Sequence, residues 1–170
     1  GHHPHLKMSF GPPLPLGFRS QAEVFDLELT RPPGFDLAER LNTVLPDGLR
    51  VTGTRPILYK NPSLMSQMEG ASYRVRFPAS YLAEAGIAPG DLNSLLNERV
   101  TALMEQDVVV VRRKSEDKAR EFDAKPSIVA MHPSQDELPA VLDLHLRFTL
   151  RASARPDDML GLLIPEADPR

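Results

Sequence analysis

A repeated order of segments, strand then helix then strand, constrains the fold of this chain most. Residues 22–29 alternate apolar and acidic side chains, which is the period of a strand with one buried face. Asp36 can then cap a helix whose apolar positions share one side before the Pro-Asp-Gly turn at 46–48. Residues 49–58 are predicted to form the next strand. The first part of the chain therefore predicts a strand, a helix and a strand.

The second part of the chain repeats this order and adds strands. The predicted elements are strands at 72–77, 108–111, 127–131 and 140–151, a helix that begins at Asp91 and a short helix at 159–163. This order predicts an α+β fold with tandem ferredoxin-like halves, in which antiparallel sheets carry helices on one face.

The chain length bounds the number of domains. At 170 residues the chain is long enough for one well-packed domain but short for two independent ones. We therefore expect one domain over 1–170, with sub-halves at about 1–70 and 71–170. Because the first sub-half supplies only one clear helix and two clear strands, we expect it to be truncated at its N-terminus.

Composition excludes several classes of site. The chain has no cysteine, which excludes disulfides, thiolate zinc sites, iron–sulfur clusters and cysteine nucleophiles on this chain. A net charge of −3 argues against a protein that wraps duplex nucleic acid through bulk charge, although a local basic site is compatible with it. No run of about 18 apolar residues predicts a membrane span, so we expect a cytoplasmic protein.

The opening segment holds the leading candidate site. His3, His5 and Lys7 alternate, so an extended backbone would point them to one side. His3 and His5 could chelate a divalent metal, and Glu23 or Asp26 could complete its set of ligands. The same side chains could instead hold a phosphate group or an RNA backbone. The third interpretation is that the histidines and prolines only shape an extended loop.

Other basic residues could contact phosphate groups. Arg74 and Arg76 alternate outward along a predicted strand and form a basic stripe. Arg112 and Arg113 begin a basic run that acidic residues interrupt, which is also typical of a solvated hairpin. Arg19 follows the opening segment. No phosphate-cradling loop, dinucleotide fingerprint or sharp nucleophile turn is present, so catalytic residues stay unknown and an independent enzyme has little support.

The opening Gly-His-His-Pro-His-Leu-Lys-Met-Ser-Phe-Gly-Pro-Pro-Leu-Pro-Leu-Gly resembles the signature of the bacterial radical SAM-linked protein family (domain of unknown function 2344). The segments at 46–49 and 122–126 and the Arg-Pro at 155–156 extend the resemblance over essentially the whole chain. The second position is usually aromatic in the family, and His2 departs from this. The resemblance implies association with, or fusion to, a radical SAM protein. S-adenosylmethionine and the iron–sulfur cluster would then lie on that partner.

The function expected from these features is a non-catalytic RNA-binding or substrate-presenting module that works with a radical SAM enzyme in tRNA or rRNA modification. His3, His5, Lys7 and Arg19 would form the phosphate-facing edge, and the secondary contacts would be Arg74, Arg76, Arg112 and Arg113. The RNA part is an analogy with ferredoxin-like folds that bind RNA. The alternatives are a metal-dependent enzyme centred on His3 and His5 and a protein-docking adaptor that binds no RNA.

Overall fold

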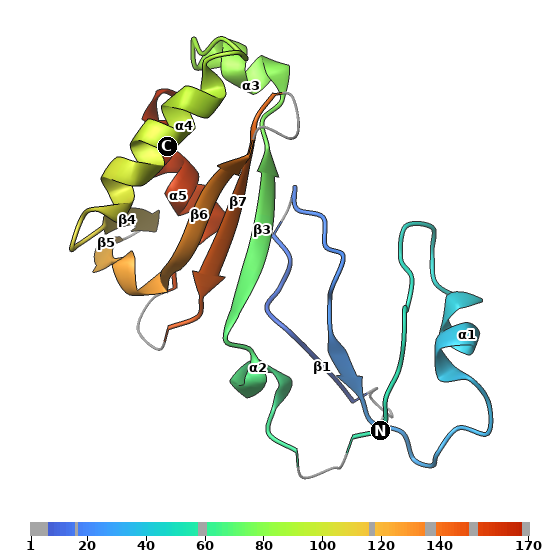
Figure 1. The fold of residues 1–170 in the computed structure, drawn as a ribbon. Helices are drawn as coiled ribbons and strands as arrows, with labels where there is room; N and C mark the ends of the chain where they lie inside the picture. Colours follow the sequence, from blue (N-terminus) through green and yellow to red (C-terminus); the bar gives the residue numbers. More distant parts are fainter. Residues whose placement is uncertain are drawn as a thin grey trace. The chain divides into compact units, whose positions relative to one another are not determined.

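The computed structural model describes residues 7–15, 17–57, 61–115, 118–134, 139–149 and 153–167. The fold is mixed α+β, with small antiparallel sheets and a few helices, which confirms the expected class (Figure 1). The chain divides into two compact units, Gly1–Met68 and Glu69–Arg170. The sequence places the division between its sub-halves next to this boundary. The tandem ferredoxin-like arrangement stays a prediction.

The first unit contains one short strand pair and two short helices. β1 (Met8–Phe10) pairs antiparallel with β2 (Phe25–Leu27), and α1 (Leu37–Asn42) and α2 (Leu64–Gln67) follow. The predicted cap is confirmed, because the Asp36 carboxylate accepts a hydrogen bond from the backbone N–H of Glu39 at 3.0 Å. This contact satisfies a backbone donor that the first turn of the helix leaves without a partner.

The strand predicted at 49–58 is wrong for the described residues 49–57, which form no strand. Val51 shows one physical reason. The side-chain amide of Asn42 accepts from the Val51 backbone N–H at 2.8 Å and donates to its carbonyl at 2.9 Å. A side chain at the end of α1 thus occupies the backbone groups that a neighbouring strand would use.

The first unit has no core of fully buried side chains among its described residues. Several large apolar side chains are exposed instead: Phe10, Val24, Phe35, Val44 and Leu49. The rings of Phe10 and Phe25 contact each other with centroids 5.9 Å apart across the β1–β2 pair. This unit therefore leaves apolar surface uncovered.

The second unit is built on a three-stranded antiparallel sheet with the order β3-β7-β6. β7 (Val141–Arg147) lies in the centre, between β3 (Gly70–Arg76) and β6 (Ile128–Ser134). Because β7 is antiparallel to both neighbours, β3 and β6 run parallel to each other. This is the strand order of a split βαβ unit.

The other elements of the second unit connect these strands or follow them. They are α3 (Ala79–Glu84), α4 (Leu92–Met104), β4 (Val110–Ser115), β5 (Lys118–Asp123), η1 (Lys125–Ser127), α5 (Pro156–Leu163) and η2 (Pro165–Ala167). β4 and β5 form a separate antiparallel hairpin, as the interrupted basic run indicates. Asp123 fixes its base, because one carboxylate oxygen accepts from the backbone N–H groups of Val109 and Lys125, each at 2.9 Å.

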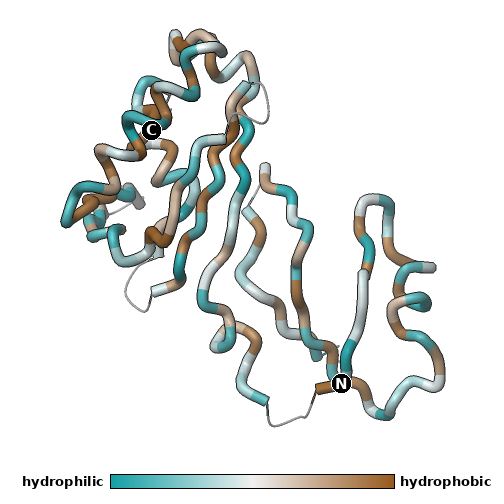
Figure 2. Tube along the Cα trace, viewed as in Figure 1, coloured by the Kyte–Doolittle hydropathy of each residue, from teal (hydrophilic) through white to brown (hydrophobic). Residues whose placement is uncertain are grey.

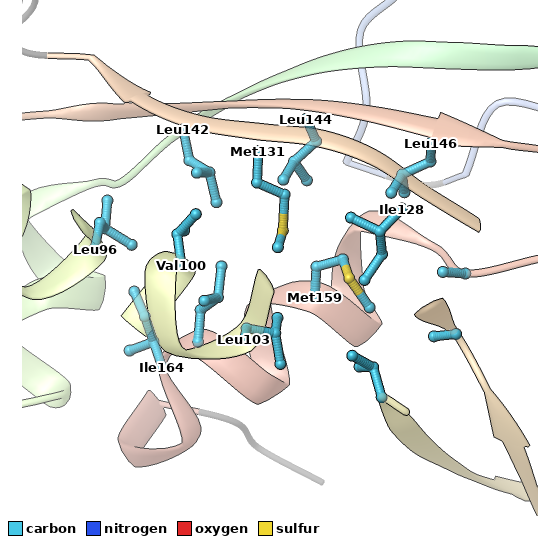
Figure 3. Close-up of a cluster of buried hydrophobic side chains, with 14 of the residues drawn as sticks. Leu96, Val100, Leu103, Ile128, Met131, Leu142, Leu144, Leu146, Met159 and Ile164 are labelled. Atoms are coloured by element: carbon cyan, nitrogen blue, oxygen red, sulfur yellow. The ribbon is translucent and has the colours of Figure 1, made fainter. Parts of the chain in front are cut away.

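The core of the second unit lies between one face of the sheet and the helices α4 and α5 (Figure 3). Leu142, Leu144 and Leu146 of β7 point to this face, because every second residue of a strand shares a side. Figure 2 follows this alternation along the strands. The helices contribute residues at helical spacing: Leu92, Leu96, Val100, Leu103, Met159 and Leu163.

An ion pair joins α4 to the segment after α5. Arg99 donates to both carboxylate oxygens of Glu166, at 2.8 and 2.6 Å, and to the Leu163 carbonyl at 2.7 Å. The hydrogen bond from Arg99 lowers the pKa of Glu166 to about 2, with a backbone hydrogen bond adding to the effect. Within the described ranges, no helix combines the length and apolar character that a membrane span needs.

Candidate functional site

The second unit presents a polar sheet surface, here called the outer sheet face. It is the side of β3, β7 and β6 opposite the core, since α4 and α5 pack on the other side (Figure 1). Its polar side chains are exposed or half-buried. They are Ser72, Arg74, Arg76, His132, Ser134, Asp143, His145 and Arg147.

The central row of this face is a charged cluster. Arg74 on β3 binds Asp143 on β7 through two hydrogen bonds, Nε to Oδ1 at 2.8 Å and Nη2 to Oδ2 at 2.9 Å. His132 lies opposite Asp143 on β6. The Arg74 hydrogen bond lowers the pKa of Asp143 despite some burial, and the charges of Arg74, His132 and Arg76 lower it further. Asp143 is therefore ionised and offsets one arginine.

A second row pairs a hydroxyl with an imidazole. Ser72 Oγ and His145 Nδ1 are 2.9 Å apart on the neighbouring strands β3 and β7. Such a pair can activate a nucleophile when a carboxylate orients the histidine. Asp143, two residues before His145, is instead bonded to Arg74. The row therefore fits binding better than nucleophilic catalysis.

The balance of charge on the outer sheet face is positive. Among the residues of this face that the structure describes, Arg74, Arg76 and Arg147 accompany one carboxylate, that of Asp143. A guanidinium group carries a planar fork of N–H donors that matches phosphate and carboxylate oxygens. The face can therefore bind anions, although the whole chain is acidic.

The leading site from the sequence falls mainly outside the described residues, because His3 and His5 lie there. Lys7 is described, and its Nζ lies 3.0 Å from Glu28 Oε1 in a pair whose Lys7 side chain is 68% exposed. Arg19 is exposed in the first unit. Surface pairs of this kind contribute little to stability.

The proposed metal centre finds no complete ligand set in the part of the chain that the structure describes. Asp26 lies on β2 opposite Ser9 of β1, and Glu23 precedes that strand. No group of three or more His, Asp or Glu side chains among the described residues is placed to hold a metal ion. The hypothesis centred on His3 and His5 concerns residues outside this part.

The two arginines of β4 have different environments. Arg112 is exposed and binds Glu121 across the hairpin at 2.6 Å. Arg113 donates to both oxygens of Asp158, at 3.2 and 2.5 Å, and to the Ser153 carbonyl at 2.7 Å. Its guanidinium also lies over the Phe122 ring, 4.8 Å from the centroid. Arg113 therefore connects the hairpin to α5, and we do not retain it as a phosphate contact.

Sequence reasoning missed most of the outer sheet face. His132, Asp143, His145 and Arg147 were not singled out, whereas Arg74 and Arg76 were. The signal for β7 was present, because three polar residues alternate with three leucines in 142–147. What alternation does not show is that β7 lies between β3 and β6, which brings these side chains next to Arg74.

Residues 1–156 match the model of a family described as an uncharacterized protein conserved in bacteria (DUF2344). The match includes all residues of the outer sheet face. No curated protein and no solved structure matches the chain.

Proposed function

The chain belongs to the bacterial DUF2344 family, and we propose that it is a non-catalytic module that binds RNA and presents it to a radical SAM enzyme in the cytoplasm. The RNA would be a tRNA or rRNA that the enzyme modifies. The outer sheet face is the binding surface in this proposal, and the tandem ferredoxin-like arrangement is its structural frame.

The observation that carries the RNA part is a sheet face whose described residues include exposed arginines in excess of carboxylates. Sheet surfaces are used by several RNA-binding modules, and arginine is well suited to phosphate oxygens. Arg76 is the last residue of β3 and Arg147 is the last residue of β7. Because the strands are antiparallel, the two arginines lie at opposite ends of the β3–β7 pair. An extended polyanion can contact both positions at the same time.

The radical SAM part is supported by the resemblance of the opening segment to the radical SAM-linked family. Because the chain has no cysteine, the partner would provide the iron–sulfur cluster together with S-adenosylmethionine. The chain would contribute RNA binding and positioning only.

The test is RNA binding by the full chain, measured by fluorescence anisotropy with labelled bulk tRNA and rRNA fragments. We expect the double variant Arg76→Ala/Arg147→Ala to bind roughly tenfold more weakly, since two charged donors are lost. The charge-matched control is Arg40→Ala/Arg50→Ala, which removes two exposed arginines of the first unit. Equal weakening in both variants would contradict a site on the outer sheet face.

A further variant tests the opening segment. In His3→Ala/His5→Ala/Lys7→Ala, weaker RNA binding with retained folding would extend the binding surface to the first unit. Unchanged binding, together with a loss in the double arginine variant, would limit the surface to the outer sheet face.

The second candidate function is a protein-docking adaptor, which the exposed apolar side chains of the first unit favour. Phe10, Phe35, Val44 and Leu49 are each at least 60% exposed, and groups of such residues mark protein interfaces. An adaptor is expected to hold a radical SAM protein without RNA and at high salt, because the Debye length is only about 3 Å at 1 M. Co-elution of the two purified proteins both at low salt and at 1 M salt would favour the adaptor. Dissociation at high salt would count against it.

A further inference from the structure

We infer that an RNA base stacks on the imidazole ring of His145 in the outer sheet face, and that Ser72 is a positioning residue for this ring. This inference rests on the RNA-binding role proposed above, and it names one residue of the site that contacts a base. Three observations support it: the place of His145 in the sheet, its hydrogen bond and its neighbours.

His145 lies in the middle of the outer sheet face. It belongs to β7, the central strand, where it pairs with Ser72 on β3 and with Ala130 on β6. The residue is exposed although a strand lies on each side of it. RNA-binding modules built on a sheet stack bases on exposed rings of the sheet surface, and histidine is one of the side chains that bases stack on.

The hydrogen bond to Ser72 holds the ring in one orientation. Ser72 Oγ and His145 Nδ1 are 2.9 Å apart. Because Nδ1 is at the edge of the imidazole, this bond leaves the flat faces of the ring uncovered. A side chain that is already fixed loses less conformational entropy when a ligand binds, so the bond favours stacking.

The neighbours of His145 leave room for a nucleotide. On the β6 side the facing residue is Ala130, whose side chain is a single methyl group. Along β7, Arg147 is exposed two residues further on, at a distance of roughly 7 Å along the strand. Arg147 pairs with Gly70, which has no side chain. A base on His145 and a phosphate group on Arg147 can therefore be held at the same time.

Stacking and phosphate binding by His145 predict different results. Histidine usually changes charge between pH 5 and 8, so measurements at pH 8 favour the neutral ring. Loss of one stacked base is expected to weaken binding at least about fivefold. A neutral ring releases no counter-ion, so His145→Ala should keep the dependence of affinity on salt. Loss of a phosphate contact would instead reduce the magnitude of the logarithmic slope by about 0.7.

The experiment measures binding of the full chain to labelled poly(A) and poly(U) at pH 8 across a salt series, by fluorescence anisotropy. We expect His145→Ala and His145→Gln to bind at least about fivefold more weakly, and His145→Phe to stay within about twofold of the wild type because it keeps a ring. Asn97→Ala is the control, since it removes an exposed polar side chain of α4, on the other side of the sheet. Circular dichroism of each variant shows that it is folded.

Two further variants test the role of Ser72. Ser72→Ala should weaken binding about threefold, because the ring is no longer held. Ser72→Thr keeps the hydroxyl group and should bind like the wild type. Wild-type affinity in Ser72→Ala would show that this residue does not position the ring.

The outcomes separate this inference from the proposed function. Wild-type affinity in His145→Ala or His145→Gln for both RNAs would overturn the stacking role and leave RNA binding standing. A loss that His145→Phe shares, or a smaller salt slope in His145→Ala, would do the same. A wild type that binds neither RNA would overturn the proposed function and this inference together.

Discussion

Replacing Asp158 by Ala is expected to destabilise the second unit by about 3–5 kcal/mol. The Asp158 side chain is 2% exposed and accepts both hydrogen bonds of the Arg113 fork. It also accepts from the backbone N–H of Arg155 at 2.8 Å, so it caps the start of α5. The variant loses the cap and leaves a largely buried guanidinium without its counter-ion. Urea unfolding followed by circular dichroism measures the free energy of unfolding.

The hairpin provides a matched control for this prediction. Glu121→Ala breaks the neighbouring ion pair with Arg112, whose two side chains are 77% and 56% exposed. The expected loss is below about 1 kcal/mol, because solvent already screens this pair. The double change Arg113→Met/Asp158→Leu should recover part of the stability, since it leaves no unpaired charge behind. Equal losses for Asp158→Ala and Glu121→Ala would contradict the structural role of the buried pair.

Replacing Gly70 by Ala is expected to cost about 1–3 kcal/mol through a steric clash in the sheet. A Cβ atom at this position would lie 2.4 Å from the Leu146 carbonyl oxygen and 3.1 Å from the Arg147 Cα, and both are backbone atoms. The start of β3 would therefore have to move away from β7. Amide hydrogen exchange should show faster exchange at the β3–β7 pairing, and urea unfolding should show the lower stability.

Gly90→Ala is the control for this substitution. A Cβ atom there would have no neighbour within 4 Å, and the backbone does not adopt the left-handed conformation. We expect a change within about 0.5 kcal/mol in either direction. If Gly70→Ala is as mild as Gly90→Ala, the close approach between β3 and β7 is not tight in solution.

Local patterns predicted most of the second unit. The alternation in 72–77 and 140–151 identified β3 and β7, and helical spacing after Asp91 identified α4. α3 was missed because it begins after Pro78 without a side-chain cap, in a short stretch that also contains Gly86, Pro89 and Gly90. A helix of this kind is stabilised by packing, in this case through the buried Leu82.

The candidate site was less predictable because it depends on pairings between distant residues. Arg113 and Asp158 are 45 positions apart, and no local pattern indicates that β4 and the start of α5 meet. Arg74 and Asp143 are 69 positions apart. The sequence therefore indicated that Arg74 points outward but not which carboxylate it contacts. The order of the strands and the packing of the core determine which side chains meet in these pairs. Neither is visible in a local sequence pattern.

The central position of β7 couples the core to the outer sheet face. Its leucines at 142, 144 and 146 face the helices, and the residues between them face outward. A shift of the strand by one residue would exchange the two sets, exposing leucines and burying charges. An insertion or deletion within β7 is therefore expected to disrupt the core and the outer sheet face together. A change of length in a connecting loop leaves both in place. Relatives that retain the function should vary in length between strands and keep the spacing within this one.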